Sequence, residues 1–166
     1  MSTGYDAKIT RIGAMALFDL KGKEKAVKAW CKGLPAFPQA ANSFSEKEGV
    51  RLLYIGRDHW QVLADLTLED QLSGALRPAL APLDVSVVRV SDTQCFFSVT
   101  GVDAAQIMAI ASPLDLHPST FPTNGATFSE VFSLKALILP TPGGFLFSVE
   151  QSFGDMVEDY LARAMA

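Results

Sequence analysis

The strongest constraint on the fold is a recurring order of segments, in which adjacent strand-like runs are followed by a helical run. The strand-like runs lie at residues 50–56 and 59–65, at 85–92 and 94–101, and at 126–134, 135–141 and 145–151. The helical patterns that follow begin at Thr67, Asp103 and Ser152, each with Asp or Gln three residues later as in a capping box. Adjacent strands pair as antiparallel hairpins, and the helices cover them. The sequence therefore predicts an α+β fold of duplicated strand-strand-helix units with antiparallel sheets, in a single domain spanning residues 1–166.

The last helical pattern is the most regular. Its apolar residues recur at helical spacing, and they are Phe153, Met156, Val157, Tyr160 and Leu161. We therefore expect all five side chains to be largely buried.

The N-terminal part is less regular. Residues 9–20 predict one strand, residues 22–33 a helix that ends at Gly33, and residues 35–49 a loop. Lysines recur at steps of four, three and four, which would place them on one face, and they are Lys21, Lys25, Lys28 and Lys32. Such a face could bind an anion or RNA, but a solvated helix face is the favoured interpretation.

The composition is apolar for a protein of this size. Hydrophobic residues make up 49% of the chain, so either the core is well filled or a partner covers part of the surface. No apolar run approaches the roughly 18 residues of a membrane span, so a cytoplasmic location is expected. Residues 91–166 carry two basic and eight acidic residues, which argues against nucleic acid as a partner.

The chain lacks the sequence signatures of common active sites. It has no nucleophile elbow, phosphate-binding loop, dinucleotide fingerprint or zinc-protease motif. Its two cysteines, Cys31 and Cys95, are expected to be apolar fillers. With only His59 and His117 available, no metal site is expected, and a structural or interface role is favoured for both histidines. We therefore predict no catalytic residue and no metal ligand.

A proline-rich loop at residues 112–122, SPLDLHPSTFP, is the most distinctive local feature. Prolines fix φ, so such a loop loses little entropy when it docks against a partner. Asp115 is expected to accept a backbone N–H in its own loop and fix a turn. The predicted subunit-interface residues are Pro113, Leu114, Asp115, Leu116, His117, Phe121 and Pro122.

Several stretches resemble gamma subunits of heterotetrameric sarcosine oxidase. The first is the hairpin RLLYIGRDHWQVLAD, and the second is the segment at residues 87–122 that ends in the loop PLDLHPSTFP. The closing strand and helix FLFSVEQSFGDMVEDYLARA are also similar to that family. The resemblance extends from about residue 50 to the C-terminus.

The resemblance implies a fold, partners and cofactors. Gamma subunits of this kind are similar in fold to the folate-binding domain of aminomethyltransferases, such as the T protein of glycine cleavage. The resemblance implies alpha and beta subunits as partners, in a complex that demethylates sarcosine oxidatively and transfers the one-carbon unit to tetrahydrofolate. The complex would use FAD, FMN, NAD and tetrahydrofolate, with no cofactor assigned to this chain.

One departure from the aminomethyltransferase pattern bears on activity. Where those enzymes place a carboxylate that helps to activate folate, this chain has Lys135, Ala136 and Leu137 in the segment FSLKALILP. Two interpretations remain: an accessory, non-catalytic subunit of a sarcosine oxidase, which we favour, or a stand-alone module that binds folate or RNA.

Overall fold

The computed structural model describes residues 4–166, and these form two compact units. The first unit joins the N-terminal segment up to Gly13 to Thr93–Ala166. The second unit is formed by Ala14–Asp92. Each unit contains one antiparallel five-stranded sheet with helices on it, as predicted for the fold class.

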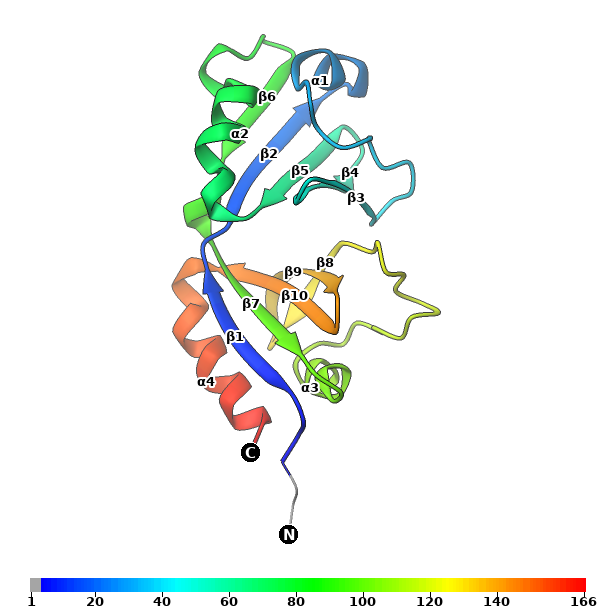
Figure 1. Ribbon diagram of the computed structural model, residues 1–166, viewed down its shortest axis with the longest axis vertical. Helices are drawn as coiled ribbons and strands as arrows, with labels where there is room; N and C mark the ends of the chain where they lie inside the picture. The colour runs from blue at the N-terminus through cyan, green and yellow to red at the C-terminus, as the bar shows by residue number, and fades with distance from the viewer. Residues whose placement is uncertain (1–3) are drawn as a thin grey trace. The chain divides into compact units, whose positions relative to one another are not determined.

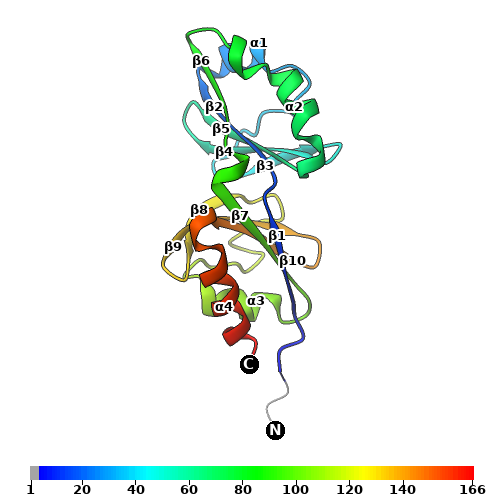
Figure 2. The same ribbon diagram turned by 90° about the vertical axis from the view of Figure 1, so that its left-hand side faces the viewer.

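The second unit has a sheet of order β3-β4-β5-β2-β6 (Figure 1). Its strands are β2 (Ala16–Gly22), β3 (Phe44–Lys47), β4 (Val50–Gly56), β5 (His59–Ala64) and β6 (Val85–Arg89), and its helices are α1 (Glu24–Trp30) and α2 (Glu69–Leu76). Short 3₁₀ turns at Leu66–Leu68 and Pro78–Leu80 flank α2. Both helices pack on one face of the sheet (Figure 2). There Val27 and Leu76 meet Phe18, Trp60 and Val62 in one apolar core.

The first unit has a sheet of order β1-β7-β10-β9-β8. Its strands are β1 (Lys8–Gly13), β7 (Gln94–Thr100), β8 (Thr127–Val131), β9 (Leu134–Thr141) and β10 (Gly144–Glu150), and its helices are α3 (Ala104–Ala111) and α4 (Gly154–Ala164). Short 3₁₀ turns at Ser91–Thr93 and Gln151–Phe153 precede β7 and α4. The core of this unit is built on Phe97 and Phe147, whose rings stack with centroids 5.4 Å apart.

The two units share one topology, except that one edge strand comes from a different part of the chain in each unit. In the second unit the chain runs strand, helix, three-stranded meander, helix, strand, from β2 to β6. The first unit follows the same path from β7 through α3, the meander β8-β9-β10 and α4. In place of a strand after α4, β1 from the N-terminal segment fills the edge position that β6 fills in the other unit. The sheet of the first unit therefore combines two segments that are far apart in the sequence.

The repeat extends to side chains in the first hairpin of each meander. The β3–β4 turn has positive φ at Glu48 (53°) and Gly49 (77°), and the β8–β9 turn has positive φ at two consecutive residues as well. Consecutive positive φ values match the twist of a tight hairpin. In both hairpins a basic side chain covers a phenylalanine ring: Arg51 over Phe44 at 5.5 Å, and, 84 residues later, Lys135 over Phe128 at 4.7 Å. The predicted duplication thus includes matched local contacts.

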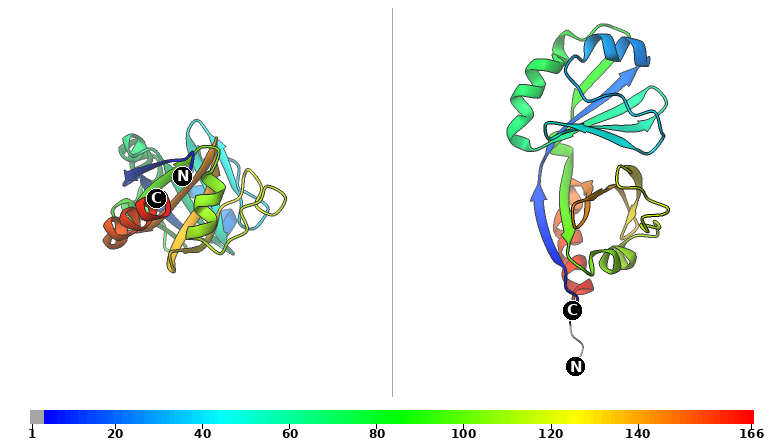
Figure 3. Two further views of the ribbon diagram at one scale, coloured as in Figure 1. Left: turned by 90° about the horizontal axis from the view of Figure 1, so that it is seen from below. Right: turned by 45° about the vertical axis from the view of Figure 1, so that its right-hand side comes forward.

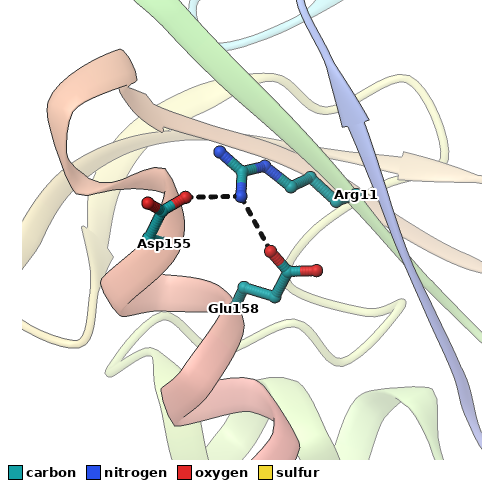
Figure 4. Close-up of polar contacts among 3 residues, drawn as sticks. All are labelled: Arg11, Asp155 and Glu158. Atoms are coloured by element: carbon teal, nitrogen blue, oxygen red, sulfur yellow. Dashed lines mark hydrogen bonds and ion pairs between the residues drawn. The ribbon is translucent and has the colours of Figure 1, made fainter.

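Arg11 links strand β1 to the C-terminal helix α4 (Figure 4). Its Nη1 lies 2.7 Å from the Asp155 carboxylate and 2.8 Å from that of Glu158. These two hydrogen bonds raise the pKa of Arg11 above its ordinary value. A side chain at Gly154 would crowd the Arg11 guanidinium, because an added Cβ would lie 2.7 Å from Nη2. Glycine at position 154, the first residue of α4, therefore leaves room for the Arg11 side chain.

Three expectations for the secondary structure are corrected. Residues 9–20 form two strands rather than one, β1 and β2, which belong to different sheets. The predicted loop at residues 35–49 contains β3, which pairs with β4. The residue that caps the turn before α2 is Asp65, whose carboxylate accepts the N–H of Thr67 at 2.9 Å.

The C-terminal helix is confirmed, but its buried stripe differs from the prediction. Val157 and Leu161 are fully buried, whereas Phe153 and Tyr160 remain 36% and 39% exposed. The 3₁₀ turn at Gln151–Phe153 delays the helix, and no side-chain cap from Ser152 forms. The buried face consequently passes through Gly154, Val157 and Leu161.

Candidate functional site

The predicted interface loop is an ordered segment between α3 and β8 (Figure 3, yellow-green). It contains turns but no helix or strand at residues 112–122. Leu116 and Phe121 are buried in the core of the first unit, and Leu114 packs against that core. Three apolar anchors therefore fix the course of the loop.

Asp115 fixes the turn at the centre of this loop. Its Oδ1 accepts the backbone N–H of His117 at 3.0 Å, which confirms the predicted hydrogen bond. The same N–H and the hydroxyl of Thr120 lower the pKa of Asp115, because both donate to the ionised carboxylate. The His117 carbonyl accepts the N–H groups of Thr120 and Phe121, each at 2.8 Å. The loop is thus held by its own hydrogen bonds as well as by its apolar anchors.

Most of the remaining side chains of the loop face outward, and Ser112 is buried. Pro113, Asp115, His117 and Pro122 are exposed. Loop residues 112–118 and the outer face of α3 enclose an open groove of about 490 Å³. Among the predicted interface residues, the exposed ones are accessible to a partner. The buried Leu116 and Phe121 hold the loop in position.

Removing the charge of Asp115 should loosen the loop in a pH-dependent manner. The folded-state pKa of Asp115 is lowered, so its stabilising effect is present above the unfolded value of about 4. This effect is lost as the pH falls through the folded-state value. We expect Asp115→Asn to lower the urea midpoint at pH 7 and the difference from wild type to shrink at pH 3. A difference that is equal at both pH values would contradict this role of the carboxylate.

The second unit carries a separate polar network on β2 and β5. Asp19 Oδ1 lies 2.6 Å from His59 Nε2 and 3.3 Å from Gln61 Nε2, and Asp19 Oδ2 lies 3.3 Å from Lys21 Nζ. An aspartate that orients a histidine is part of hydrolytic triads, which also need a nucleophile bonded to the histidine. His59 Nε2 is hydrogen-bonded to Asp19 itself, and this contact supplies no nucleophile. The network therefore joins two strands across the face opposite the core.

The sequence did not reveal this network, because it depends on strand pairing. Asp19 pairs with Gln61 and Lys21 pairs with His59 in the antiparallel register of β2 and β5. The polar residues at alternate positions of each strand were visible, but their register was not.

Other candidate groups take structural roles. Lys21 lies on β2 rather than on the helix, and Lys28 pairs with Glu24, so the lysines form no continuous face. Cys31 and Cys95 are buried free thiols, as predicted, and burial raises the pKa of Cys31 to about 11. No group of His, Cys, Asp and Glu side chains within residues 4–166 could hold a metal ion.

The segment that departs from the aminomethyltransferase pattern lies on β9. Ala136 and Leu137 are fully buried in the sheet, and Lys135 is exposed. Across from Lys135, in register, lies Glu130 on the edge strand β8. The strand itself therefore presents no carboxylate at these three positions.

Comparisons with known proteins agree on the fold. Residues 32–166 match the sarcosine oxidase, gamma subunit family. A chain of the heterotetrameric sarcosine oxidase from Corynebacterium sp. U-96, in complex with pyrrole 2-carboxylate, is 21% identical, with a TM-score of 0.79 over 96% of this chain and 83% of that chain. The glycine cleavage system aminomethyltransferase T from Bartonella henselae is 15% identical, with a TM-score of 0.72 over 96% of this chain and 46% of that one. A search of curated proteins finds no match.

A third structure is more distant. The regulatory subunit of aspartate kinase from Thermus thermophilus, in a ligand-free form, is 14% identical, with a TM-score of 0.52 over 96% of this chain and 98% of that chain. At these identities the solved structures establish the fold alone. They confirm the prediction that the chain has the fold of folate-binding aminomethyltransferases.

None of the helices within residues 4–166 is long and apolar enough to cross a membrane.

Proposed function

Because the chain belongs to the sarcosine oxidase gamma subunit family, we propose that it is the accessory, non-catalytic subunit of a heterotetrameric sarcosine oxidase. The observation that carries this proposal is the family match over residues 32–166, most of the chain. The proposed partners are the alpha and beta subunits. Residues 1–166 would act as a single folate-binding-like domain in this complex, and the proposed location is the cytoplasm.

The proposed complex demethylates sarcosine oxidatively and passes the one-carbon unit to tetrahydrofolate. FAD, FMN, NAD and tetrahydrofolate would be held by the complex, and no cofactor is assigned to this chain. Two features support an accessory role. The sequence has no dinucleotide fingerprint, and the three positions Lys135, Ala136 and Leu137 on β9 lack the carboxylate expected in aminomethyltransferases.

We propose that the loop at residues 112–122 contributes to the contact with the other subunits. Its shape is fixed before binding by the Asp115 turn and by buried anchors, so little conformational entropy would be lost on assembly. The proposed interface comprises Pro113, Leu114, Asp115, Leu116, His117, Phe121 and Pro122. Within it, the exposed residues would touch the partner.

The stand-alone module that binds folate or RNA is not favoured. Its support was a continuous lysine face, and the structure places Lys21 on β2, Lys25 and Lys28 on α1, and Lys32 in the turn after α1. Lys28 and Lys21 also pair with acidic neighbours, which reduces the charge available to phosphates.

Co-purification tests the proposed assembly. We expect the tagged chain, expressed together with candidate alpha and beta chains, to retain both through size-exclusion chromatography as one complex. An unrelated small protein with the same tag serves as the control. A chain that elutes alone and binds RNA in a salt-dependent manner would contradict the proposal.

A further inference from the structure

Helix α3 carries an outer face without charge. Its sequence, AAQIMAIA, contains no Asp, Glu, Lys or Arg, and it is the one such helix among the four α-helices of residues 4–166. The inner face, which includes Ile107 and Met108, is buried in the core. The outer face presents Ala105, Gln106, Ala109 and Ile110 to solvent; Ile110 is 53% exposed, and the Gln106 amide donates to Asp103 Oδ1. A surface helix normally has charged residues as well on this side.

The repeated topology supplies an internal comparison for this face. Helix α1 follows the first strand of the second unit, as α3 follows β7 in the first. On α1 the outward positions include Lys25 and Lys28, with Ala29 beside them. The uncharged face is thus a property of α3 and not of this position in the fold.

The groove beside this face has one fixed charge. It is lined by Ala105 and Ala109 of α3 and by loop residues 112–118, which include the His117 imidazole but no Lys or Arg. Asp115 lies in this lining with its carboxylate held by the His117 N–H. A carboxylate can accept about four hydrogen bonds, so Asp115 keeps acceptor capacity for a partner. An occupant that matches this groove would be apolar along its length and basic at one point.

We propose that the groove between α3 and the loop is the docking site for an apolar segment of a partner subunit that places a Lys or Arg side chain against Asp115. Burial of the α3 face would supply the affinity, and the ion pair would set the register of the segment. The inference rests on the proposed function, because it names the chemistry of the partner at the proposed interface.

A pair of matched arginine substitutions tests the docking site. Ala109→Arg fills the groove and places a positive charge where the basic side chain of the partner would lie. Ala29→Arg makes the same change at an exposed alanine on α1. With the full chain and purified alpha and beta chains, we expect Ala109→Arg to weaken binding more than about 10-fold and Ala29→Arg less than about 2-fold. Both variants should unfold in urea near the wild-type midpoint, since both alanines are exposed.

Asp115→Asn tests the charge. It should weaken binding about 2- to 10-fold at low salt and reduce the dependence of affinity on salt concentration. If the Ala109→Arg variant binds the partner chains as tightly as wild type, the proposed docking site is wrong, and the proposed function still stands. An unchanged salt dependence in Asp115→Asn would overturn the basic partner. A wild-type chain that binds neither subunit would instead overturn the proposed function.

Discussion

Replacing Ala136 by Asp is expected to unfold much of the protein under conditions in which the wild type is stable. Ala136 is completely buried on β9, within the core of the first unit. A carboxylate there would lose its hydration and have no basic partner in that core. An unpaired buried charge costs on the order of 3–5 kcal/mol, a large part of the roughly 5–15 kcal/mol that separates folded from unfolded domains. Urea unfolding followed by circular dichroism measures the difference.

The neighbouring Lys135→Asp provides the control. Lys135 is exposed on the same strand, with its ammonium over the Phe128 ring and Glu130 opposite it on β8. This variant loses a cation–π contact and gains a like-charge pair, so it should lose only about 1–2 kcal/mol. Comparing the stabilities of the two variants tests whether β9 can accommodate a carboxylate where the aminomethyltransferase pattern would place one. We expect the Ala136→Asp variant to gain no one-carbon transfer activity, because position 136 lies in an apolar core. An Ala136→Asp protein as stable as Lys135→Asp would contradict this account of β9.

The features that the sequence predicted well are those determined by neighbouring residues. The β4–β5 hairpin follows from two apolar runs about the Arg57-Asp58 turn, and Asp58 indeed adopts a positive φ of 57°. The turn at Asp115 needs only the N–H of His117, two residues away. The end of α2 is also set locally, because Pro78 follows the cap residue Arg77 and cannot continue the helix.

The features that were missed depend on residues far apart in the chain. Strand β3, with the polar sequence FSEK, is a strand because β4 pairs with it. The break between β1 and β2 reflects their membership of two sheets, and only Gly13 marks it in the sequence. Leu80 follows Leu72 and Leu76 at a spacing of four residues but is 71% exposed, because the left-handed Arg77 turns the chain before it.

The second large expected effect concerns activity, which should be absent from the chain alone and present in the complex. Oxidation of sarcosine needs a redox cofactor, because no ordinary side chain carries hydride chemistry. The sequence offers no dinucleotide fingerprint, and one-carbon transfer lacks its expected carboxylate on β9. The chain would therefore contribute to the activity through its contacts with the other subunits.

An assay of sarcosine turnover tests the central claim most directly. Three samples are compared in the presence of tetrahydrofolate and added flavin: the purified chain, the alpha and beta chains without it, and the complex of all three. We predict turnover by the complex and none by the purified chain above a heat-killed control. Turnover by the purified chain alone would contradict the assignment of an accessory, non-catalytic subunit.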